Sequence, residues 1–484
     1  MSKRTMNFSC RGLLLMAVLL MAACNQRPSN ERQVGAQPRI FPDYVGVTVP
    51  ADIAPLNFAM ADDSVTRIDV TLQGDNGGSL HVNGTYADFP LEAWHELLQR
   101  NRGGQLRVSV AARRDGHWTR YSTFLISVSE DSIGAQAVSY RRIAPGYEQY
   151  GHMGIYERRL SDFTETTLVD NASTPGQCIN CHTSNGGRSN EYVYHARGEK
   201  PGTFLLKGQG AKGKGQDPEN IATEDCRDLI GGAMVYPGWH PGGRYIAFST
   251  NKTSQMFHLA NAQKRIEVYD ASSDVFVYDI QTRSVLRDTL TMRHLWAENC
   301  PAFSPDGRWL YFVTARRQVY PTDYQKECYS LCRVPFDERT GHYAGAVDTL
   351  VRAGSDGIPS VAWSRPTPDG RHVLFVVTQW GYFSIWHPEA DLWLLDLQTG
   401  ERRPLDEVNS QRAESFPSCC PRSRWFLFTS RRGDGLYSRI YFSHLNADGR
   451  ATKPFLLPQR NPKDYDLRSL YSFNTPEFRL TCNK

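Results

Sequence analysis

The chain has 484 residues, of which 40% are hydrophobic and 22% are charged. It is therefore too long for one small core and too apolar for a disordered polymer, and two or more packed units are expected. The 55 Lys and Arg residues against 51 Asp and Glu residues leave a charge too close to neutrality for a nucleic-acid-binding surface. The 39 Gly, 27 Pro, 22 Phe, 23 Tyr and 10 Trp residues favour strands and turns, which excludes an all-helical protein.

The first 23 residues have the pattern of a secretory signal peptide. Basic residues precede an apolar run from Leu13 to Ala23, and this run is too short to span a bilayer. The end of the run and the next residue read LMAAC, which resembles the lipobox of bacterial lipoproteins. The resemblance implies that residues 1–23 are removed and that Cys24 carries the lipid that holds the protein on a membrane. An ordinary export signal followed by a chance cysteine is the alternative.

Residues 24–37 are polar and contain proline, as expected of a tether between the membrane and the first folded domain. Bacteroidota lipoproteins that reach the cell surface often carry an acidic run directly after the lipidated cysteine. Here Asn25, Gln26 and Arg27 follow it, which departs from that pattern. We therefore expect an exported protein that is lipid-anchored in the cell envelope, at the outer membrane and facing the periplasm.

The segment 38–134 is predicted to form a β domain. Short stretches such as Ile68–Leu72, Leu106–Val110 and Phe124–Val128 alternate apolar and polar residues, and glycine-containing turn signals separate them. About 95 residues in this pattern suggest an immunoglobulin-like β-sandwich, which we expect to orient its neighbour rather than to bind a ligand. One short helix is expected from about residue 90, with an apolar face formed by Leu91, Trp94, Leu97 and Leu98.

Internal repetition dominates the rest of the chain. Four segments align without gaps at spacings of about 53 to 64 residues, and each joins a proline-containing turn to an apolar strand. Spacings of this size fit four-stranded propeller blades with long loops. The segments are YPGWHPGGRYIAFSTN from Tyr236, CPAFSPDGRWLYFVTA from Cys300, WSRPTPDGRHVLFVVT from Trp363 and FPSCCPRSRWFLFTSR from Phe416.

This xFSPDGxxLxF pattern resembles the propeller repeat of TolB and its relatives. The resemblance implies an all-β chain in which residues 135–484 form a TolB-like β-propeller. A fifth, degenerate copy covers residues 181–198, and strands at 152–160 and 472–480 would form a sixth blade by pairing the two chain ends. We therefore predict six blades, with seven as the alternative. These motifs are specific for architecture and say little about activity.

The motif with a defined chemistry is Cys178-Ile-Asn-Cys181-His182, which matches the C-x-x-C-H sequence of covalent c-type haem attachment. Two thiols can add to the two vinyl groups of a haem, and the adjacent imidazole can then bind the iron. A CxNCH blade in a lipidated repeat protein also resembles lipoproteins of Bacteroidota. We predict a haem c held by Cys178, Cys181 and His182, with His182 on the iron and His195 as the candidate distal ligand. A reduced or disulfide-bonded C-x-x-C beside an incidental histidine is the alternative.

The sequence favours a non-enzymatic protein without catalytic residues. TolB-like propellers also serve as lids of prolyl oligopeptidases, but the chain has no G-x-S-x-G elbow. The preferred function is a haem c lipoprotein for electron transfer or haem-linked sensing. The alternative is a haem-free propeller scaffold that binds envelope proteins or glycans, and a propeller enzyme acting on saccharides ranks third.

Overall fold

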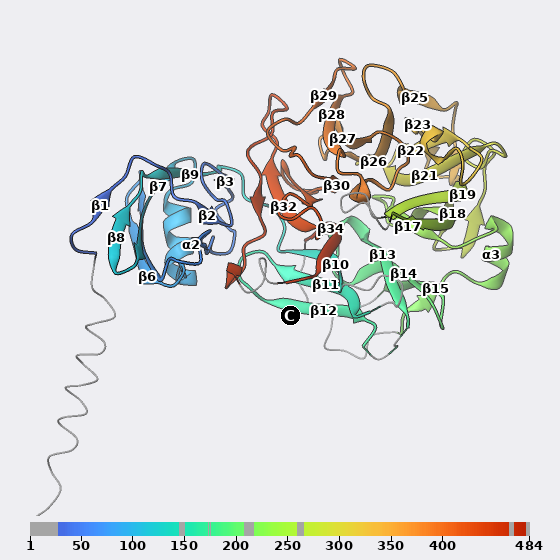
Figure 1. The fold of residues 1–484 in the computed structure, drawn as a ribbon. Helices are drawn as coiled ribbons and strands as arrows, with labels where there is room; N and C mark the ends of the chain where they lie inside the picture. The colour runs from blue at the N-terminus through green and yellow to red at the C-terminus, as the bar shows by residue number, and fades with distance from the viewer. Residues whose placement is uncertain are drawn as a thin grey trace, which may run out of the picture. The chain divides into compact units, whose positions relative to one another are not determined.

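A computed structural model describes residues 28–480, apart from residues 145–150, 173, 175, 208–216, 259–265 and 464–468. Cys24 and the predicted signal peptide lie outside the described residues. The chain divides into two compact units (Figure 1). The first takes its described residues from Met1–Gly46, Pro55–Val128 and Pro458–Leu467, and the second from Val47–Ala54, Ser129–Leu457 and Arg468–Lys484.

The first unit is built on one main β-sheet. Its strands follow the order β1-β8-β7-β5-β6, with β9 beside β7, and β2 and β4 form a separate pair. The central strands β5 and β7 are antiparallel, and Val70 opposite Val110 is one of their buried cross-strand pairs. The elements are β1 (Arg32–Gln33), β2 (Ile40–Phe41), β4 (Ala59–Met60), β5 (Arg67–Gly74), β6 (Ser79–Gly84), α2 (Leu91–Arg100), β7 (Gln105–Arg114), β8 (His117–Arg120) and β9 (Phe124–Val128).

Helix α2 has the apolar face that the sequence predicts. Trp94, Leu97 and Leu98 are buried whereas Leu91 stays exposed, and the rings of Trp94 and Phe89 stack with centroids 5.3 Å apart. An immunoglobulin-like sandwich of two facing sheets is not confirmed, since the described strands of this unit form one main sheet and one short pair. Alternation shows only that a strand has one buried face; it does not distinguish a second sheet from a helix as the covering layer.

Two segments differ from the sequence-based expectation. Strand β1 pairs in parallel with β8, so part of segment 24–37, which we expected as a tether, belongs to the first sheet. The described residues of segment Pro458–Leu467, which we expected in the propeller, belong to the first unit. There the Asn57 amide donates to the carbonyl of Arg460 at 2.9 Å. Pairings this distant in sequence leave no local pattern to detect.

The second unit is a six-bladed β-propeller whose inner strands surround a common centre (Figure 1). Blade 1 is β12-β11-β10-β34, blade 2 is β13 to β16, blade 3 is β17 to β20, blade 4 is β21 to β25, blade 5 is β26 to β29 and blade 6 is β30 to β33. The elements are β3 (Thr48–Val49), β10 (Ala137–Ile143), β11 (Met153–Arg159), β12 (Glu165–Asp170), β13 (Cys178–Ser184), η2 (Asn185–Gly187), β14 (Glu191–Arg197), β15 (Gly202–Lys207), β16 (Glu219–Asn220), α3 (Glu224–Ile230), β17 (Val235–Trp239), β18 (Tyr245–Phe257), β19 (Ile266–Asp279), β20 (Ser284–Leu286), β21 (Trp296–Phe303), β22 (Trp309–Arg316), η3 (Tyr324–Lys326), β23 (Ser330–Asp337), β24 (His342–Tyr343), β25 (Asp348–Val351), β26 (Ser360–Pro366), β27 (His372–Thr378), η4 (Ser384–Trp386), β28 (Asp391–Asp396), β29 (Arg402–Pro404), β30 (Glu414–Cys419), β31 (Trp425–Ser430), β32 (Arg439–His444), β33 (Phe455–Leu456) and β34 (Ser472–Arg479).

Blade 1 closes the ring with strands from both ends of the propeller. Strand β34 pairs antiparallel with β10, with Ala137 opposite Arg479, and β11 pairs with the other edge of β10. The prediction of six blades, with the last strand in the blade of segment 152–160, is confirmed. The two predicted strands do not pair directly, because β10 lies between them. None of the described helices is long and apolar enough to cross a membrane.

Apolar side chains fill the space between neighbouring blades. Between blades 3 and 4, for example, Tyr245 and Val277 pack with Phe303, Leu310 and Phe312, and all five are buried. Burial of each such side chain contributes about 1.5–3 kcal/mol. Because the ring is closed, only short strand edges remain, and the inner strands are held rigidly around the axis.

Candidate functional site

Each inner strand carries one non-glycine residue in the left-handed backbone region. The strand pairing shifts register at the same places, as a β-bulge does. Such a backbone conformation costs of order 1–3 kcal/mol, so the surrounding sheet must impose it. We call these residues the axial ring: they are Cys181 (φ 46°), Tyr236 (φ 48°), Cys300 (φ 54°), Trp363 (φ 48°), Phe416 (φ 51°) and Thr475 (φ 46°).

The axial ring places the C-x-x-C-H motif in the repeat. Cys181 and His182 of blade 2 occupy the positions that Tyr236 and Pro237 hold in blade 3. The alignment of the degenerate copy with the other repeats is therefore confirmed, and the motif lies on the inner strand β13. A left-handed residue followed by proline also occurs at Cys300, Phe416 and Thr475.

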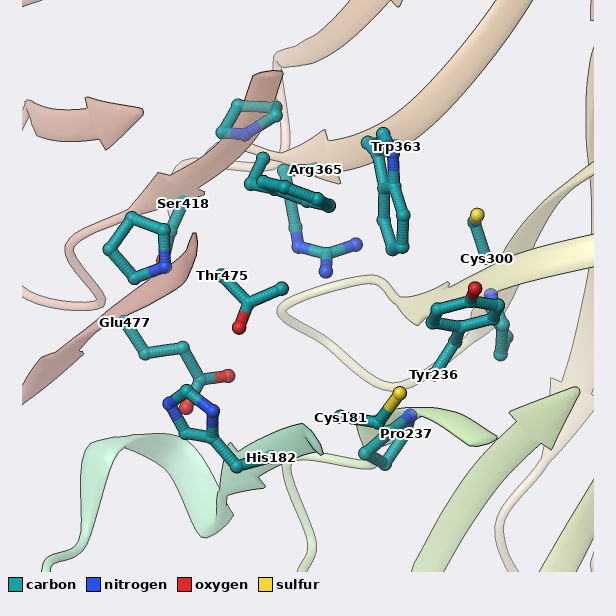
Figure 2. A pocket seen from close by; sticks show the side chains of 14 residues that line it. Cys181, His182, Tyr236, Pro237, Cys300, Trp363, Arg365, Ser418, Thr475 and Glu477 are labelled. Carbon is teal, nitrogen blue, oxygen red and sulfur yellow. The ribbon is translucent and has the colours of Figure 1, made fainter. Parts of the chain in front are cut away.

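The two thiols of the motif are buried, but they line different spaces. Cys178 lines a cavity at one axial mouth of the propeller, where the Nη2 of Arg141 lies 3.6 Å from its Sγ. Cys181 lines a smaller chamber together with the other axial-ring residues (Figure 2), and burial raises the pKa of its thiol. We call the first space the axial cavity and the second the inner chamber.

His182 lines the inner chamber beside Glu477 (Figure 2). Its side chain is 5% exposed, and neither ring nitrogen has a hydrogen-bond partner among the described residues. Burial, together with the positive charges of Arg479 and Arg141, lowers the pKa of His182 to about 3. The imidazole is therefore neutral at physiological pH.

His195 lies on β14 opposite Asn180 of β13, but it does not line the inner chamber that His182 lines. His195 is buried on β14, where its Nδ1 lies 3.0 Å from the Oγ1 of Thr203. That hydroxyl donates to the carbonyl of Met234, just before blade 3. His182 instead faces the inner strand of blade 1, which carries Glu477. Burial lowers the pKa of His195 to about 3.

The arrangement of these residues does not fit a haem c. The inner chamber beside Cys181 and His182 has a volume of about 40 Å³, which is room for about three water molecules. Pockets for larger ligands measure about 300–1,000 Å³, and the thiol of Cys178 opens into the other space. No group of three or more His, Cys, Asp or Glu side chains among the described residues could hold a metal ion. Haem attachment is therefore an untested prediction that this conformation does not accommodate.

The axial cavity has a volume of about 500 Å³. Blades 1, 2, 3, 5 and 6 contribute to it through their inner strands and the loops at this mouth. Its described lining consists of Arg141, Ile143, Met153, Cys178, Asn180, Arg197, Tyr236, Thr253, Gln255, Phe257, Ile266, Val268, Phe383, Ile385, Trp386, Arg431, Ser472 and Asn474.

This described lining is cationic: it includes three arginines and no acidic residue. The Nε of Arg141 donates to the carbonyl of Ile179 at 2.8 Å, and the guanidinium of Arg431 lies 3.7 Å from the ring centroid of Trp386. The guanidinium of Arg197 has no hydrogen-bond or ion-pair partner among the described residues. A guanidinium that keeps its charge without a carboxylate partner is a natural anion-binding group.

Sequence reasoning missed these arginines. Arg141, Arg197 and Arg431 belong to blades 1, 2 and 6, and no local motif marks any of them. Arg197 lies in the degenerate repeat copy, where the cysteines and histidines form the recognisable motif. Each lies near the end of the second strand of its blade, β10, β14 or β31, so basic residues at these strand ends are the signal that could have found them.

The fold and the axial site define a six-bladed propeller with a ligand-sized axial cavity. No family model matches this chain, and no curated protein matches it. Solved structures resemble its fold.

Among the solved structures, Kuenenia stuttgartiensis hydrazine synthase is 11% identical over 72% of this chain and 48% of that chain, with a TM-score of 0.45. A Mycobacterium tuberculosis puromycin-hydrolyzing peptidase is 13% identical over 74% and 52%, with a TM-score of 0.37. The Vibrio parahaemolyticus oligogalacturonate lyase is 11% identical over 65% and 100%, with a TM-score of 0.27. This chain spans about half the length of the first two. At these identities the likeness concerns the fold alone.

Proposed function

We propose that this chain is a lipid-anchored envelope protein whose propeller binds an anionic glycan in the axial cavity. One observation carries the proposal: among the described residues, three guanidinium groups and no carboxylate line a cavity of about 500 Å³. Guanidinium groups bind carboxylates and sulfates through paired, charge-assisted hydrogen bonds. The half-buried site strengthens the attraction, because solvent screens it less than at an open surface.

The rest of the cavity favours a saccharide over an inorganic anion. Asn180, Gln255 and Asn474 offer amide donors and acceptors that suit sugar hydroxyl groups. Tyr236 and Phe383 offer aromatic surface for the C–H faces of sugar rings. The described lining thus combines guanidinium, amide and aromatic side chains, the three kinds of group that an anionic sugar would contact.

Calorimetric titration of the full chain with digalacturonate and with its methyl ester tests this proposal. The acid should bind and the uncharged ester should not. Arg197→Gln should weaken binding of the acid tenfold or more, because a hydrogen bond to a charged group contributes about 1.5–3 kcal/mol. Arg339→Gln, which changes a side chain that is 83% exposed on blade 4, is the matched control. Equal affinity for acid and ester, or no binding of either, would contradict the proposal.

Haem c attachment for electron transfer or sensing is the second candidate. Besides the motif, one observation favours it: both ring nitrogens of His182 are buried without a hydrogen-bond partner among the described residues. Attachment requires β13 to rearrange so that Cys178 and Cys181 reach one haem edge. Pyridine haemochrome spectroscopy of protein from a host with haem c maturation tests it. A colourless product with free thiols at both cysteines removes this candidate; a haem c spectrum that disappears in the double Cys→Ala variant supports it.

A further inference from the structure

The inner chamber concentrates buried polar atoms that lack partners. Both ring nitrogens of His182, the Nε1 of Trp363 and the Oγ1 of Thr475 have no hydrogen-bond partner among the described residues. All three residues line this one chamber. Buried polar groups are nearly always hydrogen-bonded, so a cluster of exceptions indicates a bound species that satisfies them. His182 and Trp363 are 5% and 3% exposed, which places the cluster away from bulk solvent.

These groups offer mainly donors to the chamber. The indole N–H of Trp363 can only donate, and so can the guanidinium of Arg365, which lines the same space. Among the described residues, the guanidinium of Arg365 donates from its Nη1 to the carbonyl of Ser364 at 2.9 Å. Thr475 has one hydroxyl hydrogen, and the neutral imidazole of His182 has one N–H. In the view of Figure 2 the guanidinium of Arg365 lies between Trp363 and Thr475.

Glu477 is the one carboxylate in the described lining of the chamber. It accepts from the hydroxyl of Thr183 and from both the amide and the hydroxyl of Ser184. These bonds direct its oxygens toward β13 and spread its charge. Burial raises the pKa of Glu477.

We propose that the inner chamber binds a monoatomic inorganic anion of the chloride class, held by Trp363, Arg365, Thr475 and His182. A volume of about 40 Å³ admits a halide with one or two waters and is too small for a sugar acid. Prolines after four axial-ring residues, Tyr236, Cys300, Phe416 and Thr475, add apolar wall and no backbone donor. Tyr236 lines both this chamber and the axial cavity, but the four residues that would hold the anion line the chamber alone. The proposal therefore does not depend on what the axial cavity binds.

Bromide replaces chloride and scatters X-rays anomalously, so it reports the position of the anion. Crystals of the full chain soaked in sodium bromide should show an anomalous peak within hydrogen-bond distance of the Trp363 Nε1 and the Arg365 guanidinium. Water density alone in the chamber would overturn the proposal. So would bromide peaks only on the protein surface, which would mean an adventitious ion only. A peak at Arg197 instead would assign the anion to the axial cavity and equally overturn it.

Thermal unfolding provides a second readout. Bromide should raise the Tm relative to gluconate at equal ionic strength, by about 2 °C at a concentration ten times the dissociation constant. Trp363→Phe, which keeps a ring but removes the donor, should abolish this rise, whereas Trp296→Phe, at a residue that is 37% exposed, should retain it. If Trp363→Phe does not fold, Arg365→Gln serves in its place. A bromide-dependent rise of equal size in both chamber variants would contradict the assignment.

Discussion

His182 of blade 2 stands at the position that Pro237 holds in blade 3, directly after a left-handed residue of an inner strand. The second half of the C-x-x-C-H motif is thus part of the propeller repeat. The bulge and the sheet around Cys181 already account for its backbone conformation. It also carries an imidazole into the chamber where other blades have a proline ring.

The lipobox leads to a prediction about membrane attachment. In the predicted lipoprotein, Cys24→Ser should move from the membrane pellet to the soluble fraction, because lipid supplies nearly all membrane affinity of a protein anchored in this way. Fractionation with a salt wash measures the outcome. A Cys24→Ser protein that still pellets and resists salt would show that another part of the chain binds the membrane.

Ring closure through β34 leads to a prediction about stability. Removal of residues 472–484 should lower the Tm sharply or cause aggregation, because β10 loses its partner strand and exposes an unpaired edge. Removal of residues 481–484 alone keeps β34 and serves as the control. An unchanged melting temperature in the longer truncation would mean that the propeller does not depend on this closure.

The buried ion pair between Arg479 and Glu157 connects the two ends of the propeller. The Nε of Arg479 lies 3.2 Å from the Oε2 of Glu157, and the side chains are 0% and 3% exposed. Arg479→Met should destabilise the protein by about 3–5 kcal/mol, because it leaves a buried carboxylate without this partner. The double variant with Glu157→Gln should recover part of that loss in urea unfolding. A double variant less stable than Arg479→Met would show that Glu157 does not depend on Arg479.

The buried carboxyl of Glu298 on blade 4 should make the free energy of unfolding depend on pH. Its carboxyl is fully buried and accepts from the Nε of Arg293 at 2.8 Å, and burial raises its pKa from 4.5 to about 7. The folded state then holds this proton more tightly than the unfolded chain. Its contribution to the free energy of unfolding is full below pH 4.5 and falls as pH rises to 7, by roughly 3 kcal/mol in all.

Glu298→Gln should remove this part of the pH profile. The difference in unfolding free energy between variant and parent should shift in favour of the variant from pH 5 to pH 8, as measured by urea unfolding at both values. Glu401→Gln, at an exposed position, should leave the profile unchanged. A difference that stays constant between the two pH values would contradict the raised pKa of Glu298.

The repeat pattern was sufficient to predict the propeller because each blade is largely a local structure. The turn and the strands of the copies from Tyr236, Cys300, Trp363 and Phe416 are close in sequence, so their residue types record the local fold. The first unit was harder to predict. The predictions of its strands and of the helix face at Trp94 were correct. The alternation along β5 and β7, however, did not show which layer would cover the sheet.

The sequence by itself determined the six repeating blades, the buried strands and the candidate residues at Cys178, Cys181 and His182. The tertiary structure decided which side chains share a space: it placed the two thiols in different spaces, gave His195 a hydroxyl partner outside the chamber of His182 and brought Arg141, Arg197 and Arg431 to one axial mouth. The physical reason is ring closure. It brings together residues that are hundreds of positions apart, and neither periodicity nor turn chemistry, which act over a few residues, records such encounters.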